Sequence, residues 1–173
     1  PSNLLPSSLA DCQFEACSEG KILDALPDEA VTKEAAIAGK QARHAESILE
    51  DIAGAGEPRF SALIDTGALI TGMTNAEAAR FLLERLDPAR MDGVVYLDRQ
   101  DRQMLLPRGA KAAVPLSDCG VDKERRFTFY DQVHTTGMDI KQAMNAAAVL
   151  TLSKDMVYRD LAQAKRKTAR LSS

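Results

Sequence analysis

The sequence has few of the residues that build metal sites, disulfide scaffolds or large aromatic cores. Its 173 residues include no Trp, three Cys and two His, and aromatic residues make up 5%. The cysteines, Cys12, Cys17 and Cys119, form no CxxC pair, and no HxxxH spacing occurs. We therefore expect no metal site and reduced thiols in an intracellular compartment; a Cys12–Cys17 or longer disulfide is the alternative.

Long apolar runs and an excess of positive charge are lacking too. No run approaches the roughly 20 apolar residues of a membrane span, so none is expected. The net charge of -3 gives no overall field that would attract nucleic acid or an anionic membrane. The chain begins at Pro1 without Met or a secretory leader, which is typical of a processed product or a fragment.

The sequence motif that usually binds nucleotide phosphates is also missing. No Gx4GK[ST] loop occurs in the sequence. No cofactor is therefore expected with certainty. ATP is expected only where a partner lobe supplies the other wall of a nucleotide-binding site.

The chain divides into two parts near residue 57. Residues 1–57 are rich in Ala and Glu and predict a helical N-terminal extension, in which Pro27 suits a helix start and Gly54 a helix end. From Phe60 onward strands alternate with helices, which predicts an α/β fold with a mostly parallel sheet. The expected strands are 61–64, 93–98, 103–106, 127–131 and 146–152; a helix follows a capping box at Thr74-x-x-Glu77, and another spans 155–170.

The most informative run is FTFYDQVHTTGMDIKQ, residues 127–142. It predicts a strand that stops at a polar turn containing Gly137, after which Asp139 could be held near a ligand. The alternative is a strand–turn connection with no ligand. Because the ends of parallel strands meet at one edge of a sheet, we expect this turn and the turn at 65–68 to share an edge and face one cleft.

Asp65-Thr66-Gly67, after an apolar strand, has the pattern of a retroviral-type aspartic protease, in which two carboxylates share a proton. Such a protease is all-β, whereas here a capping box and a Leu-rich helix follow almost at once. The sequence therefore favours a strand-end loop in which Gly67 supplies a permissive backbone.

Three further groups contain side chains capable of chemistry. Cys119 and His134 could form a nucleophilic pair, but a loop thiol is favoured because no oxyanion donor is evident. His44 is expected to be solvated. The charged cluster at 98–102 predicts a solvated hairpin turn.

Cations crowd the C-terminal segment of the chain: Lys154, Arg159, Lys165, Arg166, Lys167 and Arg170. Such residues suit a helix C-terminus because they complement the helix dipole. Gln163, Lys167 and Arg170 also share one side of the expected helix, where they could face a phosphate.

Taken together, residues 60–173 resemble the second RecA-like domain, the helicase C-terminal-type domain, of superfamily 2 helicases. Phe127–Tyr130 followed by HTTGMDI resembles motif V, and Ala147–Leu152 followed by YRDLAQ resembles the approach to motif VI, which begins at a Gln. The segments YDQVHTTGMDIKQ, ALIDTGALITG and TLSKDMVYRDLAQ are closer still to the helicase-like region of very large, uncharacterised eukaryotic proteins.

The resemblance implies a site that faces nucleotide or nucleic acid. On the motif V side it comprises Thr135, Thr136, Gly137 and Asp139, and on the motif VI side Gln163, Lys167 and Arg170. The chain departs from the helicase pattern QxxGRxxR, because Arg166 replaces the Gly and Lys167 replaces the first Arg. Lys cannot form the bidentate fork that Arg makes to a phosphate, and an arginine finger supplies about 10³–10⁵ in rate.

Three functions follow from these patterns. The first is a catalytically degenerate RecA-like domain that acts as a binding or scaffold module, with protein partners in a larger assembly. The alternative is a helicase-type lobe that binds ATP or nucleic acid together with a separate P-loop lobe. A hydrolase using Asp65 or Cys119 ranks last.

Overall fold

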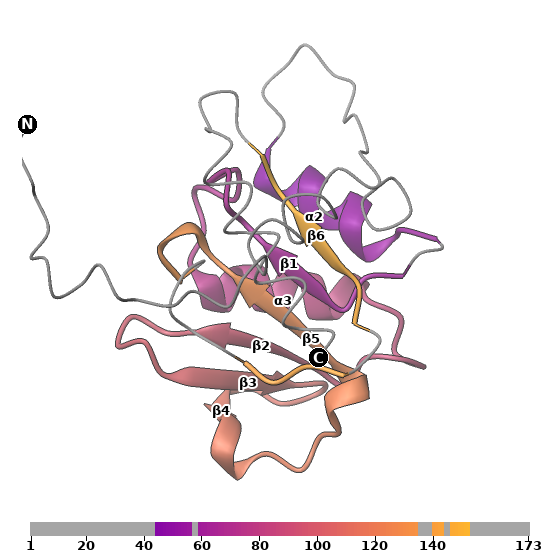
Figure 1. The fold of residues 1–173 in the computed structure, drawn as a ribbon. Helices are drawn as coiled ribbons and strands as arrows, with labels where there is room; N and C mark the ends of the chain where they lie inside the picture. The colour runs from indigo at the N-terminus through magenta and orange to yellow at the C-terminus, as the bar shows by residue number, and fades with distance from the viewer. Residues whose placement is uncertain (1–43, 57–58, 135–139, 144–145, 153–173) are drawn as a thin grey trace, which may run out of the picture. The chain divides into compact units, whose positions relative to one another are not determined.

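The computed structural model describes residues 44–56, 59–134, 140–143 and 146–152. These residues form a six-stranded, mostly parallel mixed sheet flanked by helices, so the predicted α/β class is confirmed (Figure 1). Most of the expected N-terminal extension and the whole expected helix at 155–170 lie outside the described residues, and these two expectations stay predictions.

The strands run in the order β4-β3-β2-β5-β1-β6 across the sheet. The parallel strands are β1 (Ala62–Ile64), β2 (Gly93–Leu97), β5 (Arg126–Tyr130) and β6 (Ala148–Leu150). β3 (Gln103–Pro107) forms an antiparallel hairpin with β2, and β4 (Val114–Pro115) pairs with β3. Every strand expected from the sequence is present, and β4 is an addition.

The register brings distant residues to one edge. Ile64 lies opposite Tyr130 on one side and opposite Leu150 on the other. The four parallel strands therefore end at one edge, which we call the carboxyl edge, and begin at the other, the amino edge. The expectation that the turns after β1 and β5 share an edge is confirmed for Asp65 and Asp131, the first residues of the two turns.

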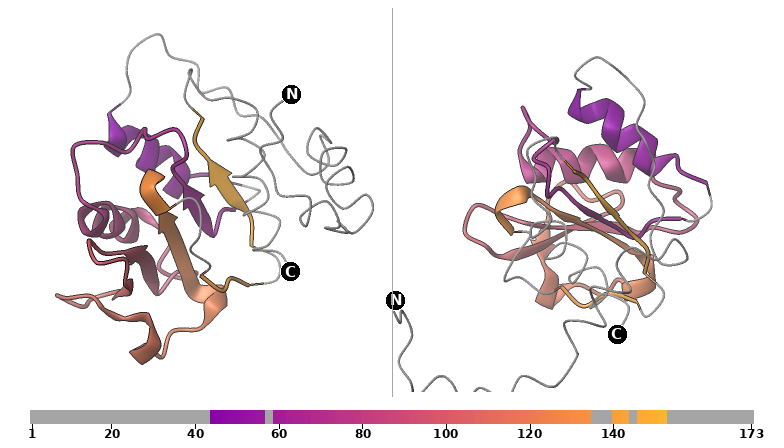
Figure 2. Two further views of the ribbon diagram at one scale, coloured as in Figure 1. Left: turned by 60° about the vertical axis from the view of Figure 1, so that its left-hand side comes forward. Right: turned by 45° about the horizontal axis from the view of Figure 1, so that its top comes forward.

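Alternation along the strands produces two apolar clusters, one on each face of the sheet. Leu63, Val94, Phe127 and Phe129 pack with two α-helices, α2 (Ala45–Ala53) and α3 (Asn75–Arg85). Figure 2 shows both helices on the same side of the sheet. Burial of this face removes the largest part of the apolar surface from water, which is the main stabilising contribution.

The other face is covered by irregular chain rather than by a described α-helix. Val95, Leu97 and Tyr130 form its centre, and Ile140 packs against them. The Ile140 N–H donates to the Tyr130 hydroxyl at 3.2 Å, so the end of the 127–142 run returns onto the strand from which it left.

α3 starts and stops where the sequence predicts, and α2 ends where predicted, but α2 starts only at Ala45 because His44, expected inside a helix that begins near Pro27, is extended. Thr74 and Glu77 form the expected capping box, and α3 ends at Leu86, just before Asp87-Pro88. α2 ends at Gly54, whose N–H donates to the Glu50 carbonyl at 2.9 Å. No helix in the described ranges is long and apolar enough to cross a membrane.

Candidate functional site

Each of the four parallel strands is followed directly by a polar residue at the carboxyl edge. Asp65 follows β1, Asp98 follows β2, Asp131 follows β5 and Thr151 follows β6. Ligands of open α/β sheets bind outside the carboxyl ends of the strands, so this edge is the candidate functional site.

Asp65 is the most enclosed of these residues, with 2% of its surface exposed. Its two carboxylate oxygens each accept a backbone N–H at 2.9 Å, one from Leu69 and one from Ile70. The Thr151 hydroxyl donates to the same carboxylate at 2.5 Å and accepts the Gly67 N–H at 3.1 Å. Asp65 thus folds the loop after β1 around itself and ties it to the end of β6.

This geometry decides between the two interpretations of Asp65-Thr66-Gly67. An all-β protease is excluded by the α/β fold, and the Asp65 carboxylate is engaged by two amides and a hydroxyl rather than by a second carboxylate. The segment forms the expected strand-end loop, but the positive φ of 51° belongs to Ala68 and not to Gly67, so the prediction that Gly67 supplies the permissive backbone is wrong. Within the described residues the buried Thr66 hydroxyl has no hydrogen-bond partner.

A second network begins at Asp131. The Asn75 side-chain amide donates to one Asp131 oxygen at 2.9 Å and to the Leu97 carbonyl at 2.9 Å. Asn75 is the first residue of α3. The start of this helix, the end of β2 and the end of β5 are therefore joined through one amide.

His134 joins the same network from the short helix η4 (Gln132–His134). Its Nδ1 hydrogen bonds to Asp131, and its Nε2 lies 2.8 Å from an oxygen of Asp101, in the turn between β2 and β3. Burial by itself lowers the pKa of His134, but the hydrogen bonds to Asp101 and Asp131 outweigh it and the pKa is raised. A protonated ring donates to both carboxylates at once, which a neutral ring cannot do.

The turn at 98–102 is the hairpin turn expected from the sequence, but its acidic side chains form defined hydrogen bonds instead of facing only solvent. Asp98 accepts the backbone N–H of Gln100 at 2.9 Å and the side chain of Arg102 at 2.7 Å. Burial raises the pKa of Asp98, but these hydrogen bonds more than compensate and the pKa is lowered. Asp101 adopts a φ of 59°, a conformation that Asp tolerates better than most residues, and its carboxylate reaches His134.

At the amino edge the charged side chains are donors: arginines pair with backbone carbonyls there. The Arg108 guanidinium donates to the carbonyl oxygens of Leu83 at 2.7 Å, Leu86 at 3.0 Å and Met91 at 2.9 Å. Leu83 and Leu86 belong to the last turn of α3 and its cap. Arg108 therefore satisfies carbonyls that have no partner at a helix C-terminus.

Arg125 holds the neighbouring loop in the same way. It forms a two-pronged ion pair with Asp92 and donates to the Ala89 carbonyl at 3.0 Å. The hydrogen bond from Arg125 is the main reason that the pKa of Asp92 is lowered. The loop that enters β2 is thus fixed by arginines on both sides.

The other residues proposed from the sequence are separated from this edge or lie beyond the described ranges. Thr135, Thr136, Gly137, Asp139, Gln163, Lys167 and Arg170 all lie outside the described residues. Cys119 packs with the second apolar cluster, whereas both ring nitrogens of His134 face carboxylates, so no Cys–His pair forms. His44 is the exposed N-cap of α2, as expected.

Several site residues were missed by the reasoning from sequence: Asn75, Asp101, Asp131 and Thr151. Asp131 and Thr151 sat inside the expected strands 127–131 and 146–152, and a polar residue at the end of a parallel strand is the signal that could have found them. Asp101 has no local signal, because its partner His134 is 33 positions away.

Comparison of the chain with known protein families, with curated proteins and with solved structures finds no match. In the described ranges, no group of three or more His, Cys, Asp or Glu residues is placed to hold a metal ion.

Proposed function

We propose that residues 60–173 form a catalytically degenerate RecA-like domain that serves as a binding or scaffold module, with the carboxyl edge facing its partner. The observation that carries this proposal is the state of the carboxylates at that edge. Asp65, Asp98 and Asp131 each accept hydrogen bonds from their own loops or from neighbouring elements, and none is left to act on a substrate. Their arrangement suits a rigid platform.

The sequence supports the same proposal. Lys167 stands where the resembling helicases have an Arg, and the chain carries no P-loop. The unsatisfied Thr66 hydroxyl beside Asp65 offers a hydrogen bond that a bound partner would complete after a small shift of the loop.

The second candidate is a helicase-type lobe that contributes motifs V and VI to a site shared with a separate P-loop lobe. The parallel arrangement of β1 and β5 favours it, because the turn that starts the motif V-like run shares an edge with Asp65. ATP would then need the partner lobe, whereas single-stranded nucleic acid would already bind weakly to this lobe alone.

Titration of the isolated chain with a fluorescent ATP analogue and with single-stranded RNA separates the two candidates. The module proposal predicts no saturable binding of either probe, together with recovery of the chain in a stable complex with protein partners. Saturable binding of the RNA, weakened by Asp139→Asn, would instead support the helicase-type lobe. An isolated chain that neither binds these probes nor associates stably with another protein would contradict both.

A further inference from the structure

β6 is the last strand in the order of the sheet, and among the described residues it pairs with β1 alone (Figure 1). The Thr151 N–H donates to the Ile64 carbonyl, at the end of β1, at 3.1 Å. Because successive residues of a strand direct their backbone groups to opposite sides, the N–H and C=O groups of Ala148 and Leu150 point away from β1. Within the described ranges these groups have no hydrogen-bond partner. We call this the outer side of β6, and it can accept a further strand.

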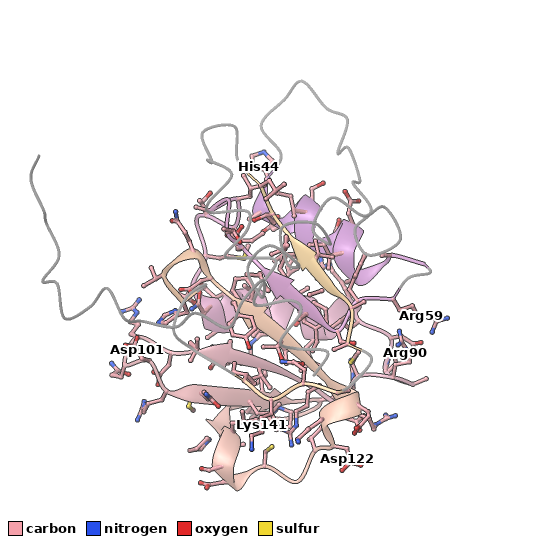
Figure 3. The ribbon with its side chains drawn as sticks, in the orientation of Figure 1. His44, Arg59, Arg90, Asp101, Asp122 and Lys141 are labelled. Carbon is pink, nitrogen blue, oxygen red and sulfur yellow. The ribbon has the colours of Figure 1, made fainter. Side chains whose placement is uncertain are left out.

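The two outermost strands differ in how well they are protected against pairing with another chain. Proteins usually protect such strands with proline, charged side chains or a bulge. β4, at the other end of the strand order, contains Pro115, which has no N–H to donate. Residues 146–152, AAAVLTL, contain no proline and no charged side chain, and Figure 3 shows the carboxylates of Asp101 and Asp122 on other parts of the molecule. The outer side of β6 therefore lacks the protection that β4 has.

Exposed apolar surface lies at the end of the same strand. Leu152 comes two residues after β6 and is 47% exposed. In the described part of the chain, Val133 and Leu152 are the large apolar side chains that are exposed. A strand laid along the outer side of β6 would cover part of Leu152, which adds hydrophobic stabilisation to the backbone hydrogen bonds.

A second copy of the chain fits the outer side of β6. When two β6 strands pair antiparallel about a two-fold axis at Val149, Ala148 of each copy lies opposite Leu150 of the other. Both residues direct their N–H and C=O groups outward, so each such pair exchanges two hydrogen bonds. Because residues 146–152 are uncharged, this pairing brings no like charges together in that run. Two-fold symmetric contacts are also the commonest in homo-oligomers.

We propose that the chain forms a two-fold symmetric dimer in which β6 of each copy pairs antiparallel with β6 of the other, so that the two sheets join into one. The contact is short, so we expect a weak dimer with a Kd on the order of 0.1 mM. Antiparallel pairing points the carboxyl edges of the two copies in opposite directions, and the dimer therefore presents the candidate site twice. The dimer does not depend on the function proposed for the carboxyl edge, because it uses backbone groups of β6 and not the carboxylates of that edge.

Sedimentation velocity at about 20 μM and about 500 μM, on either side of the expected Kd, tests whether the chain associates. We expect the weight-average mass to rise with concentration from near 18.7 kDa toward twice that value. An NMR sample that mixes ¹³C-labelled and unlabelled chain then locates the contact. Because the Val149 residues of the two copies face each other in a non-hydrogen-bonded pair, an intermolecular NOE should join their α protons.

Ala148→Pro separates the outer side of β6 from the rest of the fold. It removes the outward N–H but keeps the bonds to β1, since an outermost strand tolerates proline where the missing N–H faces solvent. Two-fold symmetry removes this hydrogen bond twice, so the Kd should rise at least about tenfold. Ala76→Pro removes an N–H of the first turn of α3 that has no intrahelical partner; it is the matched control, with no change in Kd expected. A dispersed amide spectrum shows that each variant is folded.

A mass that stays at that of one chain up to about 500 μM, several times the expected Kd, would overturn the proposal. A dimer that Ala148→Pro leaves as tight as before would overturn it too, because another surface would then form the contact. If Ala148→Pro does not fold, the NOE in the unsubstituted chain decides: its presence between the two Val149 residues supports the β6 pairing, and its absence in a dimeric sample contradicts it.

Discussion

Side chains of opposite charge hold the loops at the two edges of the sheet, carboxylates at the carboxyl edge and guanidiniums at the amino edge. At the carboxyl edge, Asp65 and Asp98 accept hydrogen bonds from backbone N–H groups of the loops that follow them. At the amino edge, Arg108 donates to backbone carbonyls of α3 and of the loop that enters β2, and Arg125 donates to another carbonyl of that loop. Each edge therefore uses the charge that matches its unpaired backbone groups.

The reason lies in the direction of the chain. A helix that connects parallel strands starts at the carboxyl edge and ends at the amino edge, as α3 does between β1 and β2. A helix start leaves N–H groups without partners, whereas a helix end leaves carbonyls. Arg108 pairs with carbonyls of the helix end at the amino edge. Asp65 and Asp98 pair with N–H groups of loops rather than of a helix start. Because buried backbone groups must be paired, neither arrangement requires a ligand.

Among the substitutions that test this comparison, Asp65→Asn is expected to lower the free energy of unfolding most. The new amide presents an N–H to backbone amides that need an acceptor, so the free energy of unfolding in urea should fall by about 3 kcal/mol. Asp122→Asn, at an exposed position before β5, is the matched control and should change stability by less than about 0.5 kcal/mol. Equal effects of the two substitutions would show that Asp65 does not hold its loop.

Arg108→Met tests the amino edge. It keeps much of the apolar stem but leaves the carbonyls of Leu83, Leu86 and Met91 without their donor, so we expect a loss of about 2 kcal/mol, measured by thermal unfolding. Arg99→Met, in the exposed hairpin turn, is the control. If the control is as destabilising as Arg108→Met, the guanidinium contacts carry no stability of their own.

Thr74→Ala tests the other end of the helix that Arg108 caps. Loss of the capping hydroxyl should reduce the free energy of unfolding by about 1 kcal/mol, less than the effect of Arg108→Met, because one side-chain hydrogen bond to the first turn is lost. Thr74→Ser, which keeps the hydroxyl, should restore nearly all of the stability. A Ser variant as unstable as the Ala variant would point to packing instead.

The pH dependence of His134 gives the smallest expected effect. The pKa of His134 is raised in the folded chain, so its contribution to stability is complete below the unfolded value, about 6.5, and is lost as the pH rises through the folded value. The difference in unfolding free energy between the unsubstituted chain and His134→Gln should therefore be larger at pH 5.5 than at pH 8.5. A difference that grows with pH would mean that the ring is held neutral between Asp101 and Asp131.

The sequence predicts the regular elements of the sheet well and the network between them poorly. The strands at 62–64, 93–97 and 126–130 and the capping box at Thr74 follow from local patterns of apolar residues, turns and caps. Parallel pairing then places Asp65 and the 127–142 run at one edge.

Contacts such as His134 to Asp101 and Thr151 to Asp65 depend on which loops meet in three dimensions. Neither pair is close in the sequence, since 33 and 86 positions separate the partners. For Asp65 the sequence favours a strand-end loop over an acid catalyst, and its hydrogen bonds to the Leu69 and Ile70 amides confirm the loop. A local motif identifies the residue type, but the partners decide the chemistry.

Amide hydrogen exchange in the loop after β1 tests the central claim most directly. The Leu69 and Ile70 amides belong to no helix or strand, yet both donate to Asp65. If the carboxylate holds this loop, both amides exchange far more slowly than the exposed Gly120 amide, and Asp65→Asn abolishes the protection. Exchange of Leu69 and Ile70 as fast as that of Gly120 in the unsubstituted chain would contradict the account.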